Sequence, residues 1–97
     1  MDPPEFHRLA EYELNEAAQY YDLEDAGLGG AFLAQVDRCL HAIEAAPEAG
    51  AILRGEVRRR LLGRFPYALL YKIKPNGIRI LAVMNLRRRP NYWIDRE

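Results

Sequence analysis

The chain has 97 residues, of which 49% are hydrophobic and 29% charged, and its net charge is zero. This length and composition predict one soluble globular domain over residues 1–97, because no length remains for a second core. No apolar run approaches the ~20 residues that a membrane span needs, so we expect no membrane partner. Cys39 has no intrachain partner, which excludes a disulfide framework and favours a cytoplasmic protein. The two histidines lack a supporting carboxylate motif, so we expect no metal. The chain has no phosphate-binding glycine loop and no dinucleotide fingerprint, so we expect no other cofactor.

Charge is divided unevenly along the chain. Residues 1–50 carry two basic and eleven acidic side chains, whereas residues 51–97 carry twelve basic and three acidic ones. Such a division suggests that the second half binds an anionic partner, either nucleic acid or an acidic protein segment. The alternative is that the two halves neutralise each other across the fold.

Two amphipathic helices are predicted in the first half of the chain. From about Leu9 to Asp25, apolar residues recur at steps of three and four, with acidic side chains on the other side. A glycine cluster at 27–30 interrupts this pattern. A second apolar stripe then runs from Phe32 to Ile43 and ends before Pro47. Two helices joined by a short glycine loop predict an antiparallel hairpin.

Alternating apolar residues predict strands in the second half. We expect strands over 56–62, 65–74 and 78–84, with a turn at 74–77 that joins the last two as an antiparallel hairpin. The segment around residues 5–8 is expected to add a very short edge strand, since Pro3 and Pro4 restrict it. These elements predict an α+β domain in the order β-α-α-β-β-β, with a helical hairpin packed on one face of a mainly antiparallel sheet.

The alternation also predicts which strand residues face the helices. That set is Tyr67, Leu69, Tyr71, Ile80 and Ala82. The opposite face then carries an apolar strip made of Ala68, Leu70, Leu81 and Val83. An exposed apolar strip of this kind usually marks a partner site.

The C-terminal part combines arginines with aromatic residues but offers no clear catalytic group. The run Arg87-Arg88-Arg89 precedes Tyr92 and Trp93, and guanidinium groups bind phosphates or carboxylates in a bidentate way. The alternative interpretation is that the two aromatic rings pack on the core while the arginines remain solvated. His7 and His41 lie in the acidic half, away from this basic region, so proton transfer is difficult to assign. The sequence therefore indicates a binding surface more readily than an active site.

The order of several short motifs resembles that of a known protein superfamily. These motifs are Ala17-Ala18-Gln19-Tyr20-Tyr21, Gly27-Leu28-Gly29 with Phe32 and Val36, Ile43 with Pro47 and Gly50, Val57-Arg58-Arg59, Arg64-Phe65-Pro66-Tyr67, Leu70-Tyr71, Ile80-Leu81-Ala82-Val83 and Arg88-Arg89-Pro90-Asn91-Tyr92-Trp93. Together they resemble the RelE/ParE toxins of type II toxin–antitoxin modules, and the second half favours the ParE-like branch. The resemblance covers residues 5–96. It implies the fold given above, toxicity to the host cell and neutralisation by a cognate antitoxin in a hetero-oligomer.

The two branches of that superfamily differ in their targets. ParE-like members poison DNA gyrase, whereas RelE-like members cut messenger RNA on the ribosome. The nuclease pattern has an arginine directly after the aromatic residue that matches Tyr67, and this chain has Ala68 there. The remaining nuclease positions are matched by Arg58 and Arg60, loosely, and by Arg87, Arg88 and Tyr92. The resemblance therefore favours a gyrase inhibitor without enzymatic activity, with a ribosome-dependent endoribonuclease or an inactive antitoxin-binding module as alternatives.

Two binding sites are expected under this interpretation. The target site comprises Arg87, Arg88, Arg89, Tyr92 and Trp93. The antitoxin site comprises the apolar strip with its basic neighbour, that is Ala68, Leu70, Arg79, Leu81 and Val83.

Overall fold

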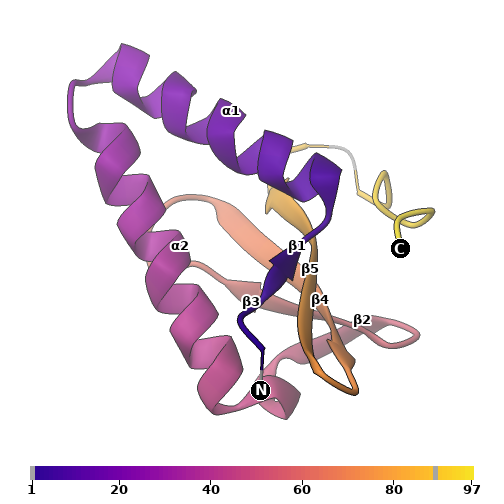
Figure 1. Cartoon of the computed structure of the whole chain (residues 1–97). Coiled ribbons are helices and arrows are strands. Elements are labelled where there is room, and N and C mark those ends of the chain that lie inside the picture. Colours follow the sequence, from indigo (N-terminus) through magenta and orange to yellow (C-terminus); the bar gives the residue numbers. More distant parts are fainter. Residues whose placement is uncertain (1, 89) are drawn as a thin grey trace.

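The computed structural model describes residues 2–88 and 90–97 and shows a helical hairpin against a five-stranded sheet (Figure 1). The elements are β1 (Glu5–Phe6), α1 (Arg8–Glu24), α2 (Leu28–Ala45), the short 3-10 helix η1 (Pro47–Ala49), β2 (Ala51–Arg54), β3 (Val57–Leu61), β4 (Tyr67–Lys74) and β5 (Gly77–Asn85). The predicted α+β class is confirmed. Neither helix is both long and apolar enough to cross a membrane, as far as the described residues go.

Side chains and glycines define the ends of the helical hairpin. Nδ1 of His7 accepts a hydrogen bond from the Leu9 N–H at 3.0 Å and caps the start of α1. Gly27 adopts a φ of 89° between the helices, and α2 begins directly after it, four residues before the predicted apolar stripe. A side chain at Gly29 would collide with the α1 backbone, and its N–H donates to the Asp22 carboxylate at 2.7 Å. The glycine cluster therefore both turns the chain and lets the two helices approach closely.

The sheet has the strand order β1-β5-β4-β3-β2. The two-residue β1 pairs with β5 in parallel, and the other neighbours are antiparallel, so the short N-terminal edge strand is confirmed. Strand β2 is an addition to the predicted order. It pairs with β3 through a two-residue turn in which Gly55 adopts a φ of 56°. All four β2 residues are exposed, so the strand carries no pattern of buried residues.

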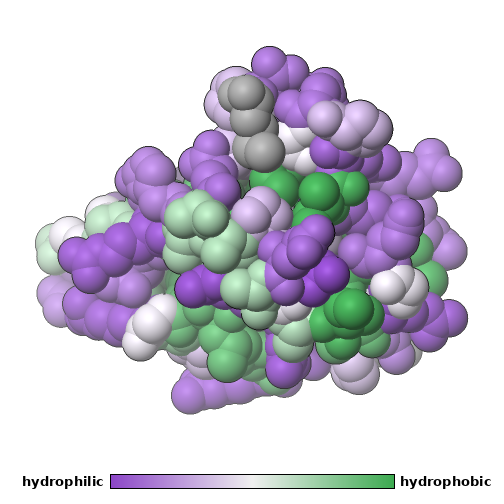
Figure 2. Space-filling model, turned by 90° about the horizontal axis from the view of Figure 1, so that it is seen from below, coloured by the Kyte–Doolittle hydropathy of each residue, from purple (hydrophilic) through white to green (hydrophobic). Residues whose placement is uncertain are grey.

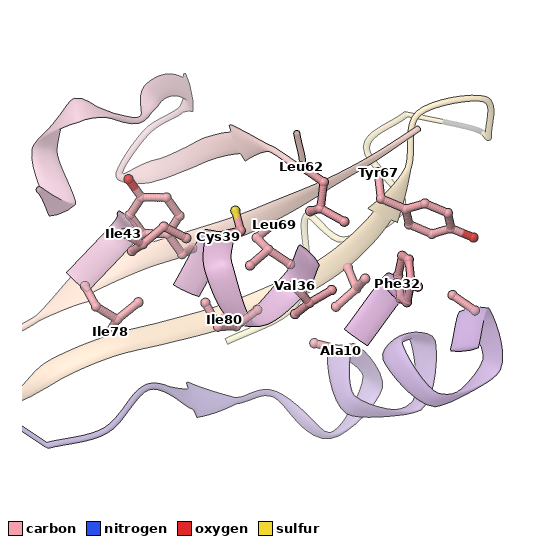
Figure 3. Close-up of a cluster of buried hydrophobic side chains, with 13 residues drawn as sticks. Ala10, Phe32, Val36, Cys39, Ile43, Leu62, Tyr67, Leu69, Ile78 and Ile80 are labelled. Carbon is pink, nitrogen blue, oxygen red and sulfur yellow. The ribbon is translucent and has the colours of Figure 1, made fainter. Parts of the chain in front are cut away.

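The main core lies between the helices and the sheet (Figure 3). Phe32 is fully buried there, with its ring centroid 5.0 Å from that of Tyr67 and 5.4 Å from those of Tyr21 and Phe65. Most of the sheet residues that were predicted to face the helices do lie in this core. The buried members of this cluster are Ala10, Ala17, Phe32, Val36, Cys39, Ile43, Leu62, Tyr67, Leu69, Tyr71, Ile78, Ile80 and Val83.

The facing of β5 changes at an irregularity that the sequence analysis did not predict. Leu70 pairs with Ala82 while Tyr71 pairs with Ile80, so β5 contains one extra residue, Leu81. This bulge shifts the alternation by one position. As a result, Val83 lies in the core under the helices, whereas Ala82 belongs to a second cluster with Leu81. The predicted facing was therefore wrong for Ala82 and Val83.

The second cluster occupies the opposite face of the sheet and is covered by the C-terminal segment, defined here as residues 90–97. Its members are Val57, Ala68, Leu70, Leu81, Ala82, Met84 and Trp93. Trp93 is only 2% exposed and packs with the residues of the predicted strip. The expectation of an exposed strip was therefore wrong, because this segment buries it. On the side of the molecule shown in Figure 2, apolar residues form separate patches among hydrophilic ones.

Candidate functional site

A groove of about 980 Å³ lies between α1 and the C-terminal part of the chain. Figure 1 shows the chain beyond β5 passing beside the N-terminal half of α1. The lining comes from α1, the β3–β4 loop, the end of β5 and the segment that follows. It comprises Leu9, Tyr12, Glu13, Glu16, Ala17, Tyr20, Tyr21, Phe65, Pro66, Tyr67, Val83, Asn85, Arg87, Arg88, Tyr92 and Arg96.

A tight turn after β5 presents two arginines to this groove. The Asn85 side-chain oxygen accepts the N–H of Arg87 at 2.9 Å, and its carbonyl accepts the N–H of Arg88 at 3.1 Å. Both arginine side chains are exposed. Within residues 2–88 and 90–97, neither forms an ion pair. The backbone of this turn is thus held in place while both guanidinium groups remain available to a partner.

An ion pair between Glu13 on α1 and Arg96 near the C-terminus holds Tyr92 beside these arginines. The Glu13 carboxylate binds the Arg96 guanidinium through two hydrogen bonds of 2.8 and 2.9 Å. The same guanidinium lies over the Tyr92 ring, 4.9 Å from its centroid. Partial burial, and then the adjacent Glu13 carboxylate, raise the pKa of Tyr92 well above its usual range. A tyrosine hydroxyl is neutral at physiological pH even at its ordinary pKa, so Tyr92 is able to donate a hydrogen bond.

The floor of the groove contains a backbone conformation that is rare for a large side chain. Phe65 has a φ of 78°, and its ring packs against Tyr21 at 4.8 Å between centroids. The Arg64 guanidinium lies 5.1 Å from the centroid of the same ring. A positive φ costs a non-glycine residue roughly 1–3 kcal/mol, which the surrounding aromatic contacts must offset. The strained loop places Phe65 and Pro66 at the surface of the groove.

The structure brings together only part of the predicted target site. Arg87, Arg88 and Tyr92 all line the groove. Trp93 is buried on the other face of the sheet, so the packing interpretation is confirmed for this residue. Arg89 lies outside the described residues. The assignment of these residues to target binding stays a prediction.

The structure brings together only three of the predicted nuclease positions, Arg87, Arg88 and Tyr92. The Arg58 guanidinium donates to the carbonyl oxygens of Glu48 and Gly50 at 2.8 and 2.9 Å, so it holds the loop before β2. Arg58 pairs with Tyr71 on β4, whereas Asn85, next to the arginine turn, pairs with Tyr67. These two pairs are four positions apart along β4, which corresponds to roughly 13 Å along the strand. Neither Arg58 nor Arg60 is among the groove residues.

The predicted antitoxin site is also divided. Val83 lines the groove, whereas Ala68, Leu70 and Leu81 are buried beneath Trp93. Arg79 donates to the carbonyl oxygen of Glu97 at 3.1 Å and so helps to hold the C-terminal segment. An antitoxin could reach the strip only after this segment had moved. The antitoxin assignment stays a prediction for these residues.

Neither histidine lies in the groove. His7 caps α1, and His41 lies 3.5 Å from Asp37 on the exposed side of α2. In the described part of the chain, no group of three or more His, Cys, Asp or Glu side chains is placed to hold a metal ion. The groove thus offers aromatic rings, carboxylates and guanidinium groups to a partner.

Sequence reasoning missed the contribution of α1 to this site. Tyr12, Glu16 and Tyr20 recur at four-residue steps and line one wall. Large aromatic residues on the polar side of an amphipathic helix are the signal that could have revealed this wall. Nothing in the local pattern links Glu13 to Arg96, which lies 83 residues further along the chain.

The geometry can be compared with known proteins. No protein-family model matches the chain, and no curated protein sequence matches it. A chain in the structure of the chromosomal ParDE toxin–antitoxin system from P. aeruginosa is similar, with a TM-score of 0.77 and 18% identity. The alignment covers 90% of this chain and 98% of that one. This chain therefore has a ParE-like fold.

The ParE-like fold agrees with the resemblance that the sequence motifs indicated. Two of those motifs meet at the groove. Phe65, Pro66 and Tyr67 form part of its floor, and Arg88 and Tyr92 contribute from the C-terminal part.

Proposed function

We propose that this chain is the toxin of a type II toxin–antitoxin module, that it inhibits DNA gyrase and that a cognate antitoxin neutralises it. The observation that supports the proposal is the groove of a ParE-like fold in which Arg87, Arg88 and Tyr92 lie together. The similar chain comes from a ParDE toxin–antitoxin system. Two exposed guanidinium groups beside aromatic rings suit a protein surface that carries carboxylates.

The chemistry of the groove favours binding over catalysis. Cleavage of RNA by general acid–base chemistry requires a group that titrates near the working pH, and histidine is the most common choice. The described groove lining contains no histidine, and Arg96 holds the Glu13 carboxylate in an ion pair. Inhibition of gyrase requires only a stable complex, which this surface can supply.

A ribosome-dependent endoribonuclease is the second candidate. Arg87, Arg88 and Tyr92 belong to the predicted nuclease set and do lie together. Arg58 is engaged with backbone carbonyl groups elsewhere, and Ala68 offers no cation at the position where the nuclease pattern has arginine. These two differences favour the gyrase inhibitor.

Tightly controlled expression tests the proposal. We expect growth arrest with induction of the DNA-damage response, and purified chain should inhibit supercoiling by gyrase. An Arg87→Ala/Arg88→Ala variant should lose both effects and keep its melting temperature, since solvated charges contribute little to stability. The matched control is Arg54→Ala/Lys74→Ala, which removes two exposed cations outside the groove.

Three outcomes would contradict the proposal. Cleavage of messenger RNA on ribosomes by the wild-type chain would establish the nuclease candidate. Binding of an antitoxin without any toxicity would indicate an inactive binding module. Full toxicity of the Arg87→Ala/Arg88→Ala variant would show that the target site lies elsewhere.

A further inference from the structure

The outer face of the sheet, on the side away from the helices, carries three cationic side chains on the adjacent strands β3, β4 and β5 (Figure 1). Arg59 on β3 pairs with Leu70 of the second cluster, so both side chains lie on this face. Lys72 lies two residues beyond Leu70 on β4 and pairs with Arg79 on β5. Lys72 and Arg79 are therefore directly opposite each other, and Arg59 is the diagonal neighbour of Lys72 at about 7–8 Å.

This arrangement of charge works against the stability of the fold. Like charges directly opposite each other on two strands destabilise a sheet. Among the residues that the structure describes, neither Arg59 nor Lys72 forms an ion pair. Arg79 is held at one side, by Glu5 at 3.5 Å and by the Glu97 carbonyl at 3.1 Å. A local arrangement that costs stability without an evident gain is typical of a functional site.

Negative charge gathers on the other side of the sheet. Helices α1 and α2 pack on the inner face and carry seven of the fourteen acidic residues, which are Glu11, Glu13, Glu16, Asp22, Glu24, Asp37 and Glu44. The outer face at Arg59 and Lys72 is turned away from them. An anionic partner is therefore attracted to the outer face and repelled from the helices.

Duplex DNA fits this face better than other anionic partners do. DNA presents one phosphate charge per ~1.7 Å of its axis, so cations spread over three strands meet several phosphates at once. Proteins that bind single strands add exposed aromatic rings on which bases stack, whereas Trp93 of the second cluster is buried. An acidic peptide would need exposed apolar anchor sites, and Val57 and Leu70 beside the cations are buried.

We propose that Arg59, Lys72 and Arg79 bind the phosphate backbone of duplex DNA without reading its sequence. Contacts to phosphates position a protein on DNA and carry no sequence information, so we expect a Kd of about 10⁻⁴–10⁻⁶ M at physiological salt. None of the three residues lines the groove. The inference goes beyond the proposed function, because this binding requires neither gyrase nor an antitoxin.

The salt dependence of DNA binding tests the proposal. Fluorescence anisotropy of a labelled duplex of about 20 base pairs, titrated with the purified full chain, gives the association constant from about 50 to about 200 mM salt. Three phosphate contacts predict a slope of about −2.7 for log K against log salt, since each contact contributes about −0.9. Two duplexes of unrelated sequence should bind equally, because their phosphates are the same.

Single substitutions assign the contacts. Arg59→Gln and Lys72→Gln should each weaken binding at least threefold at about 0.1 M salt and reduce the slope by about 0.9 in magnitude. Lys72→Arg keeps the charge and should bind as the wild type does. The matched control is Arg38→Gln, which removes one exposed cation from α2 and should leave the slope unchanged. Lys72→Gln should also keep or raise the melting temperature, since it removes the repulsion with Arg79.

The proposal fails if the duplex does not bind at about 50 mM salt, where contacts to phosphates are strong. A slope that neither Arg59→Gln nor Lys72→Gln changes would place the DNA contact elsewhere. Equal or tighter binding of single-stranded RNA or of a poly-glutamate peptide would identify a different class of partner. All three outcomes leave the proposed function standing, because inhibition of supercoiling and neutralisation by an antitoxin are measured separately.

Discussion

Glu13 on α1 and Arg96 near the C-terminus together cover the open edge of strand β5. Among the described residues, β1 pairs only with Arg79 and Ile80, and no other strand borders β5 on that side. A Glu13 carboxylate oxygen accepts the Val83 N–H at 3.0 Å, and the Arg96 guanidinium donates to the Leu81 carbonyl at 3.1 Å. The ion pair thus supplies hydrogen-bond partners that a neighbouring strand would otherwise supply to the β5 backbone. It also anchors the C-terminal segment.

Replacement of Glu13 tests this anchor. Glu13→Gln removes the charge that holds Arg96 in a pair whose side chains are 20% and 11% exposed. We expect a loss of about 1–3 kcal/mol in the free energy of unfolding, because a mostly buried guanidinium loses its partner. Trp93 is the only tryptophan, so a red shift of its fluorescence should report release of the segment. Glu16→Gln on the same helix is the control, and an unshifted Glu13→Gln spectrum would show that Arg96 does not hold the segment.

Truncation of the central aromatic residue tests the main core. Phe32→Ala should lower the free energy of unfolding by about 3–5 kcal/mol, since a fully buried ring leaves a cavity among other aromatic side chains. Urea denaturation measures the change. Leu33→Ala, at a neighbouring position that is 42% exposed, should cost much less. Equal losses in the two variants would contradict the described packing.

Gly50 should tolerate no side chain, because the Tyr71 hydroxyl occupies the space. Tyr71 is fully buried and donates a hydrogen bond of 2.6 Å to the Pro47 carbonyl, so it cannot move aside. We expect Gly50→Ala to destabilise the fold by about 1–3 kcal/mol in thermal or chemical denaturation. A methyl group at Gly63 meets only the Gln35 side chain, at 3.4 Å, so Gly63→Ala serves as the control. Unchanged stability of Gly50→Ala would contradict the Tyr71 contact.

His7 should make stability depend on pH. Its Nδ1 must be unprotonated to accept the Leu9 N–H, and burial, followed by the charge of Arg79, lowers the pKa of His7 below 6.5. Because the folded pKa lies below the unfolded one, the contribution of His7 is complete above the unfolded pKa and is lost as the pH falls through the folded pKa.

The matched variant for this prediction is His7→Asn, since asparagine caps a helix without titrating. The stability of the wild type relative to this variant should decrease from about pH 8 to about pH 5. Denaturant titrations at several pH values measure the difference. A difference that stays constant over this range would show that His7 does not couple the cap to protonation.

Local patterns in the sequence were sufficient for most of the secondary structure. The helical periodicity, the glycine cluster and the strand alternation predicted both helices, the edge strand and the β4–β5 hairpin, because each signal depends on residues close together in the chain. The motifs also indicated the ParE-like fold. Strand β2 was missed because all four of its residues are exposed and no alternation marks them.

Only the tertiary structure decided which surfaces are free. The bulge at Leu81 arises from pairing with β4 and reversed the facing of Ala82 and Val83. Opposite charges in the two halves meet in the Glu13–Arg96 pair, while Arg87 and Arg88 stay unpaired within residues 2–88 and 90–97. These outcomes depend on contacts between residues far apart in the sequence, which local periodicity does not encode. Ala68, Leu70 and Leu81 of the predicted apolar strip are buried for the same reason, since Trp93 covers them.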